Sequence, residues 1–156
     1  MPGYPIILAA DDDENDLFFL RRAFHKANLA PTLITAHDGQ EAINYLSGDR
    51  AQFPLPNLML LDIKMPCVNG FEVLDWLQTR PDLKPMPVVM LTSSNEPEDK
   101  KRAFGAGAWD YKIKPAATED LVALVQELAN RWLTEPVGPA GWPHPDQQGH
   151  SGSALP

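Results

Sequence analysis

The chain has 156 residues, enough for one domain with a hydrophobic core of its own. Its formal net charge of −8 argues against direct binding of nucleic acid, and solubility accounts for most of that charge. The single cysteine, Cys67, excludes an intrachain disulfide framework, and no apolar run approaches the roughly 18 residues of a membrane span. The first residues lack the pattern of a secretory signal, so we expect a soluble cytoplasmic protein with no membrane partner.

Apolar and β-branched runs alternate with segments of helical periodicity along most of the chain. The runs predict strands over residues 5–10, 32–36, 58–61, 88–91 and 109–113. The periodic segments predict helices over residues 14–27, 40–46, 71–79, 96–104 and 118–132, the last of them capped by Thr118. This alternation predicts an α/β domain whose parallel sheet has helices on both faces and right-handed connections. Periodicity alone leaves the order of the strands open.

The composition changes after residue 133. Residues 134–156 are rich in proline and glycine and show no apolar period. Such a segment cannot bury enough apolar surface to offset the entropy that it loses on ordering. We therefore expect one domain over residues 1–133 and a disordered tail over residues 134–156.

Polar side chains stand where four of the predicted strands end. The aspartates at 11–13 follow the first strand, Asp62 the third, Thr92 the fourth and Lys114 the fifth. The carboxyl ends of parallel strands share one edge of a sheet, so we expect these side chains to lie together. Neighbouring carboxylates repel one another unless a cation joins them, and Mg²⁺ prefers oxygen ligands. With an aspartate able to form an aspartyl phosphate, the pattern indicates Mg²⁺-dependent phosphoryl chemistry.

These residues, in their order and spacing, resemble the receiver domain of two-component response regulators. The matching features are Asp11-Asp12, Asp62 followed by Met65-Pro66 and Gly70, Thr92, and Tyr111-x-x-Lys114-Pro115, all within residues 5–133. One such pair alone is a weak signal, whereas the whole set in register is a strong one. The resemblance implies a flavodoxin-like (βα)5 fold, a doubly wound parallel sheet of five strands in the order 2-1-3-4-5.

The resemblance also implies a chemical role for each matching residue. Asp62 is expected to accept a phosphoryl group from a phosphohistidine of a sensor histidine kinase. Asp12 is expected to bind Mg²⁺ directly and Asp11 mainly through water, with Asp62 and the backbone carbonyl of Lys64 completing the ligands. Lys114 is expected to pair with Asp62 at rest and with the phosphoryl group afterwards.

The same resemblance implies how the signal leaves the site. Thr92 is expected to bond a phosphoryl oxygen, and Tyr111 to change rotamer as Thr92 moves. The added charge of about −1.5 to −2 can shift the population of a two-state element. The face formed by the fourth helix, the fifth strand and the fifth helix would present that change. We thus expect a switch with weak self-dephosphorylation rather than primarily an enzyme.

Two features are similar to small stand-alone regulators that are paired with phytochrome-type kinases. They are the long loop over residues 47–56 and the end of the last helix, residues 129–133. The similarity implies a phytochrome-type sensor kinase as partner and a homodimer formed through the last helix or an extension beyond it. We expect a stand-alone receiver, because no output domain is recognised after residue 133. The tail departs from that group's pattern, which leaves the mode of dimerisation open.

Some residues near the predicted site have two interpretations. For Asp13 we favour a helix cap over tuning of the metal, and for Cys67 an ordinary loop residue over a redox role. Lys64 and Ser94 lie at positions that affect phosphoryl lifetime in this family, or they simply face solvent.

Three aromatic residues are candidates for either the core or an interface. Trp132 completes the apolar stripe of the last helix, and it could equally anchor a partner. Phe18 and Phe19 extend the apolar surface of the first helix beyond one stripe. They form either a partner surface, where the kinases of this family dock, or contacts with two neighbouring elements.

Three other functions compete with the switch. An Asp-nucleophile phosphohydrolase commonly has a general acid two residues after the nucleophile, where this chain has Lys64. An inert binding module would not need Asp12, Asp62, Thr92 and Lys114 together. A nucleotide-binding protein of the same fold would need a glycine-rich phosphate loop, which does not follow the first strand.

Overall fold

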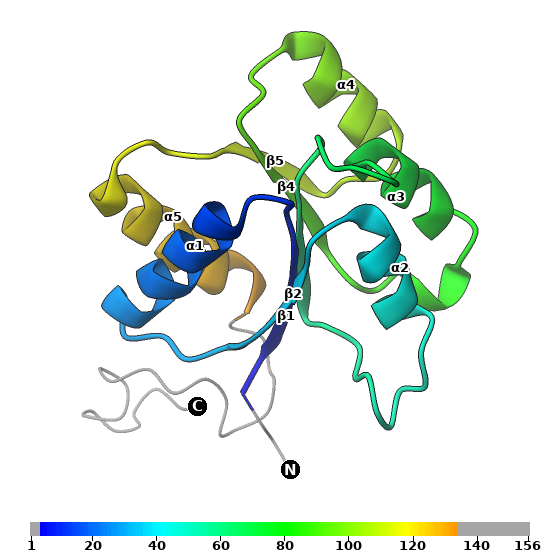
Figure 1. The fold of residues 1–156 in the computed structure, drawn as a ribbon, viewed down its shortest axis with the longest axis horizontal. Coiled ribbons are helices and arrows are strands. Elements are labelled where there is room, and N and C mark those ends of the chain that lie inside the picture. The colour runs from blue at the N-terminus through cyan, green and yellow to red at the C-terminus, as the bar shows by residue number, and fades with distance from the viewer. Residues whose placement is uncertain (1–3, 134–156) are drawn as a thin grey trace.

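A five-stranded parallel sheet forms the centre of the molecule (Figure 1). The computed structural model describes residues 4–133, and the tail predicted over residues 134–156 lies outside them. The sheet has the order β2-β1-β3-β4-β5, which confirms the order implied by the resemblance. In chain order the strands are β1 (Ile6–Ala10), β2 (Thr32–Ala36), β3 (Leu58–Leu61), β4 (Val88–Thr92) and β5 (Asp110–Ile113).

Helices cover both faces of the sheet. One face carries α1 (Glu14–Lys26) and α5 (Thr118–Trp132), which appear together on the left of Figure 1. The other face carries α2 (Gly39–Leu46), α3 (Gly70–Leu77) and α4 (Pro97–Gly105). Within residues 4–133, no helix is long and apolar enough to cross a membrane.

The central strand β3 is buried on both faces, as its uninterrupted apolar sequence predicts. Leu58 and Leu60 belong to the apolar cluster under α1 and α5, and Met59 and Leu61 to the cluster on the opposite face. Burial of each such side chain contributes about 1.5–3 kcal/mol. The strand that leads into Asp62 is therefore fixed by two layers of the core.

Side-chain caps mark the start of α1, α2 and α3 but not of α4 and α5. Asp13 accepts hydrogen bonds from the N–H groups of Asn15 and Asp16, which confirms it as the cap of α1. The cap predicted for Thr118 is wrong: Ala117 occupies the cap position of α5, and it makes no side-chain bond. Thr118 already has helical backbone, and from that position its hydroxyl does not act as the cap.

Candidate functional site

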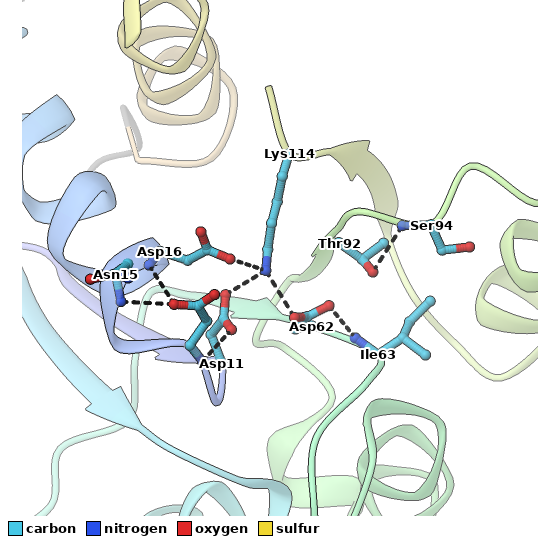
Figure 2. A network of polar contacts seen from close by, with 9 residues as sticks. Asp11, Asn15, Asp16, Asp62, Ile63, Thr92, Ser94 and Lys114 are labelled. Carbon is cyan, nitrogen blue, oxygen red and sulfur yellow. Dashed lines mark hydrogen bonds and ion pairs between the residues drawn. The ribbon is translucent and has the colours of Figure 1, made fainter. Parts of the chain in front are cut away.

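The strand ends bring two buried carboxylates to one edge of the sheet (Figure 2). Asp62 follows β3 directly and is only 6% exposed, and its backbone N–H donates to the carbonyl of Ala10 in β1. Asp11 follows β1 and donates from its backbone N–H to Ala36 in β2. The sheet therefore fixes the backbones of both aspartates, and their side chains lie beyond its edge, as predicted.

The ammonium of Lys114 lies among three carboxylates. Its Nζ is 2.7 Å from Oδ2 of Asp11, 2.7 Å from Oδ2 of Asp16 and 2.9 Å from Oδ2 of Asp62. Figure 2 shows the three contacts converging on the lysine from the side of α1 and from β3. The pairing of Lys114 with Asp62 was expected, but Asp16 was not recognised from the sequence. An acid in the first turn of a helix is ordinarily explained by its favourable interaction with the helix dipole, so its position in α1 gives no signal of this contact.

Burial and ion pairing shift the pKa values of Asp11 and Lys114 in opposite directions. Burial raises the pKa of Asp11 to about 6, although Lys114 pulls it down. Burial lowers the pKa of Lys114, but hydrogen bonds to Asp11, Asp16 and Asp62 outweigh it and raise the pKa above the ordinary value. The lysine is therefore charged at neutral pH, and the acids around it outnumber the positive charge that it supplies.

Asp11, Asp12 and Asp62 could together hold one metal ion. Each offers a carboxylate oxygen, and these oxygens all lie within 4.8 Å of one another. An all-oxygen set of carboxylates with an excess of negative charge suits a hard divalent cation such as Mg²⁺. Asp12 is exposed, so such a cation would also have room to keep waters. Lys64 is exposed too, and the ligand role predicted for its carbonyl stays a prediction.

The loop between Asp62 and α3 is tightly built. Gly70 donates its N–H to the carbonyl of Ile63 at 2.8 Å, and a Cβ at Gly70 would come within 2.2 Å of the Asp62 carbonyl oxygen. Cys67 has a positive φ of 64°, and Val68 donates across it to Pro66 in a three-residue turn. Cys67 is exposed and serves this turn, in agreement with the loop interpretation.

A second group of contacts links Thr92 to Tyr111 on the other side of Asp62. Thr92 is buried at the end of β4, and its Oγ accepts a long hydrogen bond, 3.4 Å, from the N–H of Ser94. The buried Tyr111 of β5 donates its hydroxyl to the carbonyl of Ser94 at 2.9 Å. The Ser94 hydroxyl donates to Asp99 of α4, so this side chain does not simply face solvent. Thr92 and Tyr111 thus both contact the segment that leads into α4.

The predicted interface residues lie in different environments. Phe18 and Phe19 are 55% and 48% exposed, so the interpretation of these two as core residues is wrong. Trp132 is partly buried against the cluster under α1 and α5, and its ring meets that of Trp109 edge-on at 5.7 Å. Whether any of the three contacts a partner stays a prediction.

Comparison with known proteins agrees with this geometry. The family model for the response regulator receiver domain matches residues 7–126. The chain is 35% identical to the probable methanogenesis regulatory protein FilR2 of Methanothrix harundinacea, over 82% of this chain and 83% of that protein. It is 32% identical to response regulator Rcp1 of Synechocystis, over 86% of this chain and 93% of that protein.

Solved structures give the same result. The phosphorylated cyanobacterial phytochrome response regulator RcpA superposes with a TM-score of 0.77 at 29% identity, over 85% of this chain and 96% of RcpA. The Mn²⁺-bound form of Rcp1 superposes with a TM-score of 0.74 at 31% identity, over 85% of this chain and 96% of Rcp1.

Fold and site together define a phosphoacceptor domain of the doubly wound α/β class. The chain belongs to the response regulator receiver domain family. Receivers of this family are phosphoacceptor switches of two-component systems. They interact with histidine kinases and bind Mg²⁺ or Mn²⁺ at an acidic pocket.

Proposed function

We propose that Asp62 is the phosphoacceptor of this receiver and that Asp11, Asp12 and Asp62, with the Lys64 carbonyl, hold its Mg²⁺. The observation that carries the proposal is the position of Asp62: its Oδ2 lies 2.9 Å from the Lys114 ammonium, and the same carboxylate belongs to the acidic group. A bound Mg²⁺ would supply positive charge to the phosphoryl oxygens. The three carboxylates, which offer oxygen ligands at one edge of the sheet, support this assignment.

The proposed reaction is a transfer between a phosphohistidine and a carboxylate. One Asp62 oxygen attacks phosphorus, the P–N bond to the kinase histidine breaks, and the new O–P bond leaves an acyl phosphate on Asp62. Lys114 balances the charge of the phosphoryl oxygens, and the Thr92 hydroxyl donates a hydrogen bond to one of them. Attack of water on phosphorus returns the carboxylate and releases inorganic phosphate. We expect that reaction to be slow, because Lys64 stands where phosphohydrolases commonly have a general acid.

The proposed output is a change on the face formed by α4, β5 and α5. Thr92 and Tyr111 meet at Ser94, so a displacement of the Thr92 hydroxyl toward a phosphoryl group would act on the segment to which Tyr111 is bonded. We further propose a phytochrome-type kinase as partner, on the analogy of the phytochrome response regulator RcpA, and a homodimer. Exposed Phe104, Trp109 and Ile113 near this face support an apolar contact surface, and sedimentation of the full chain at several concentrations tests for a dimer. We expect a partner kinase in the cytoplasm.

The phosphoacceptor assignment is tested by intact-mass spectrometry. Wild-type protein incubated with acetyl phosphate and Mg²⁺ should gain one phosphoryl group, and Asp62→Asn should gain none. Asp75→Asn, an exposed aspartate of α3, is the matched control and should behave as wild type. Absence of an adduct in the wild type at short times, or an adduct in Asp62→Asn, would refute the assignment.

The metal assignment is tested by titration with Mg²⁺. Asp12→Ala should weaken binding by at least about tenfold, since loss of even an outer-shell partner of a metal commonly has that effect. The control is again Asp75→Asn, whose side chain is not part of the acidic group. Equal affinity of Asp12→Ala and wild type would show that Asp12 is not a ligand.

A further inference from the structure

Asp16 differs from the other two carboxylates that surround Lys114. Among residues 4–133, the group able to hold one metal ion consists of Asp11, Asp12 and Asp62, and Asp16 does not belong to it. Yet its Oδ2 lies 2.7 Å from the lysine Nζ, as close as Asp11 and closer than Asp62. Asp16 is therefore a carboxylate that contacts the lysine of the site without contributing to the metal group.

The surroundings of this ion pair leave the lysine side chain room to move. A cavity of about 510 Å³ lies between α1 and the segment that leads into α5, and Asp11, Asp16 and Lys114 all line it. The side chain of Asp16 is 37% exposed, whereas those of Asp11 and Asp62 are nearly buried. Lys114 thus has one partner at the open side of the site and two at its buried side.

An ammonium has three hydrogen-bond donors; here it donates to Asp16 and Asp62 and forms an ion pair with Asp11. Two of these three carboxylates are the residues that the proposed function assigns to the metal and the phosphoryl group. Formation of the acyl phosphate turns one Asp62 oxygen into the bridging oxygen of a mixed anhydride and the other into a neutral carbonyl oxygen, and it places charged phosphoryl oxygens nearby. Asp16 keeps its full charge throughout, so it competes with those phosphoryl oxygens for the same ammonium.

We propose that Asp16 is a positioning residue that holds Lys114 toward α1 and so limits how strongly the lysine can stabilise phosphoryl transfer to and from Asp62. This inference rests on the proposed function of Asp62 and adds a residue that acts only through the lysine. Release of Lys114 from Asp16 should strengthen its contact with the transferring group, in which negative charge is spread over the phosphoryl oxygens. Both phosphorylation and self-dephosphorylation should then become faster.

Asp16→Asn removes the charge with little change of shape and is the test variant. At saturating Mg²⁺ its rate constants for phosphorylation by acetyl phosphate and for self-dephosphorylation should both rise roughly threefold, the scale of a partly exposed ion pair. Asp120→Asn is the matched control. Asp120 is the third residue of α5 as Asp16 is of α1, so both variants change net charge and first-turn charge alike. Within residues 4–133, Lys114 forms no ion pair with Asp120, so the control should keep wild-type rates.

A double-mutant cycle separates action through the lysine from a long-range charge effect. Asp16→Asn is combined with Lys114→Met, and the two rate constants and the Mg²⁺ affinity are measured for all four proteins. Asp16→Asn should lower Mg²⁺ affinity in the Lys114 background, because the ammonium is no longer shared with Asp16 and binds Asp11 and Asp62 more strongly, in competition with the cation. In the Lys114→Met background it should change neither the rates nor the affinity by more than about 1.5-fold.

The outcomes are distinct. Equal effects of Asp16→Asn with and without Lys114 would overturn the inference, and so would slower or unchanged rates in the single variant. A wild-type chain that gains no phosphoryl group would refute the proposed function as well. A wild-type chain that is phosphorylated normally, with no coupling between positions 16 and 114, would refute the role of Asp16 alone.

Discussion

Gly70 is the residue at which a single added methyl group should damage both the fold and the chemistry. A Cβ at this position would lie 2.2 Å from the carbonyl oxygen of Asp62 and 2.9 Å from Cα of Ile63. Both neighbours are backbone atoms, so no side-chain rotation can relieve the contact. The hydrogen bond from Gly70 to Ile63 also holds the two segments together at 2.8 Å. Gly70→Ala must therefore move the backbone that carries Asp62, the proposed phosphoacceptor.

The size of the effect follows from these distances. Ordinary contact of a Cβ begins at 3.4 Å, whereas a Cβ added at Gly70 would lie 2.2 Å from the Asp62 carbonyl oxygen. Position 70 and this carbonyl must therefore move apart by about 1.2 Å, the difference between the two distances. Forcing extra volume into a well-packed site costs about 1–3 kcal/mol. The better helix propensity of alanine in α3 returns at most about 1 kcal/mol. The middle of these two ranges leaves a net loss of about 1.5 kcal/mol and a fall in Tm of roughly 4 °C for each kcal/mol.

The effect on phosphorylation should be larger than the effect on stability. A misplacement of about 1 Å at a reacting group can slow a reaction on the order of a hundredfold. Urea unfolding would measure the loss of stability, and the rate of acetyl phosphate labelling at saturating Mg²⁺ would measure the loss of phosphorylation.

Gly105→Ala is the control for the glycine substitution itself. Gly105 ends α4, and a Cβ there meets nothing within 4 Å. The variant should be as stable as wild type or up to about 1 kcal/mol more stable, with an unchanged labelling rate. If Gly70→Ala matched Gly105→Ala in both assays, the close approach of α3 to the Asp62 carbonyl would not constrain the site.

Two further predictions concern regions away from Asp62. His37 pairs with Glu14 at 2.7 Å and Glu41 at 3.2 Å; burial lowers its pKa, but the two acids together outweigh it and raise the pKa above the ordinary value. The pair stabilises the fold fully below about pH 6.5 and ceases to do so as pH rises through the raised pKa, so Glu41→Gln should lower stability near pH 6 and not near pH 9. NMR titration of His37 should show a lowered pKa in that variant. Within residues 4–133, the buried Nε1 of Trp132 has no hydrogen-bond partner, so Trp132→Phe should change the free energy of unfolding by less than about 1 kcal/mol, against about 2–5 kcal/mol for Leu128→Ala.

The fold was largely predictable because local pattern and global architecture agree. The strands are uninterrupted apolar or β-branched runs, and the helices have stripes at their own period, so the predicted bounds differ from the observed ones by at most about two residues. The strand order needed the resemblance, since β1 and β3 are neighbours through contacts that no periodicity encodes. The cap of α5 was misassigned because Thr118 and Ala117 differ in backbone conformation, which composition does not determine.

The site was predictable only where a residue's place in the chain implies its place in space. Asp62, Thr92 and Lys114 stand at strand ends, and parallel strand ends converge. Asp16 stands within a helix, 98 residues from Lys114, and its contact depends on the rotation of α1 about its axis. The exposure of Phe18 and Phe19 depends on the same rotation, so the sequence alone left both a core and a surface position open for them.

The two flanks of Asp62 differ in mechanical stiffness. On the β3 side, backbone hydrogen bonds from Gly70 to Ile63 and from Gly39 to Val68 tie the loop to α3 and α2. On the β4 side, the segment before α4 is tied through side chains, by single hydrogen bonds that meet at Ser94. Hydroxyl groups can exchange partners by rotation, whereas the backbone bonds can break only if the loop itself is displaced. Under the proposed function, a phosphoryl group on Asp62 should therefore displace the segment before α4 more readily than the loop before α3.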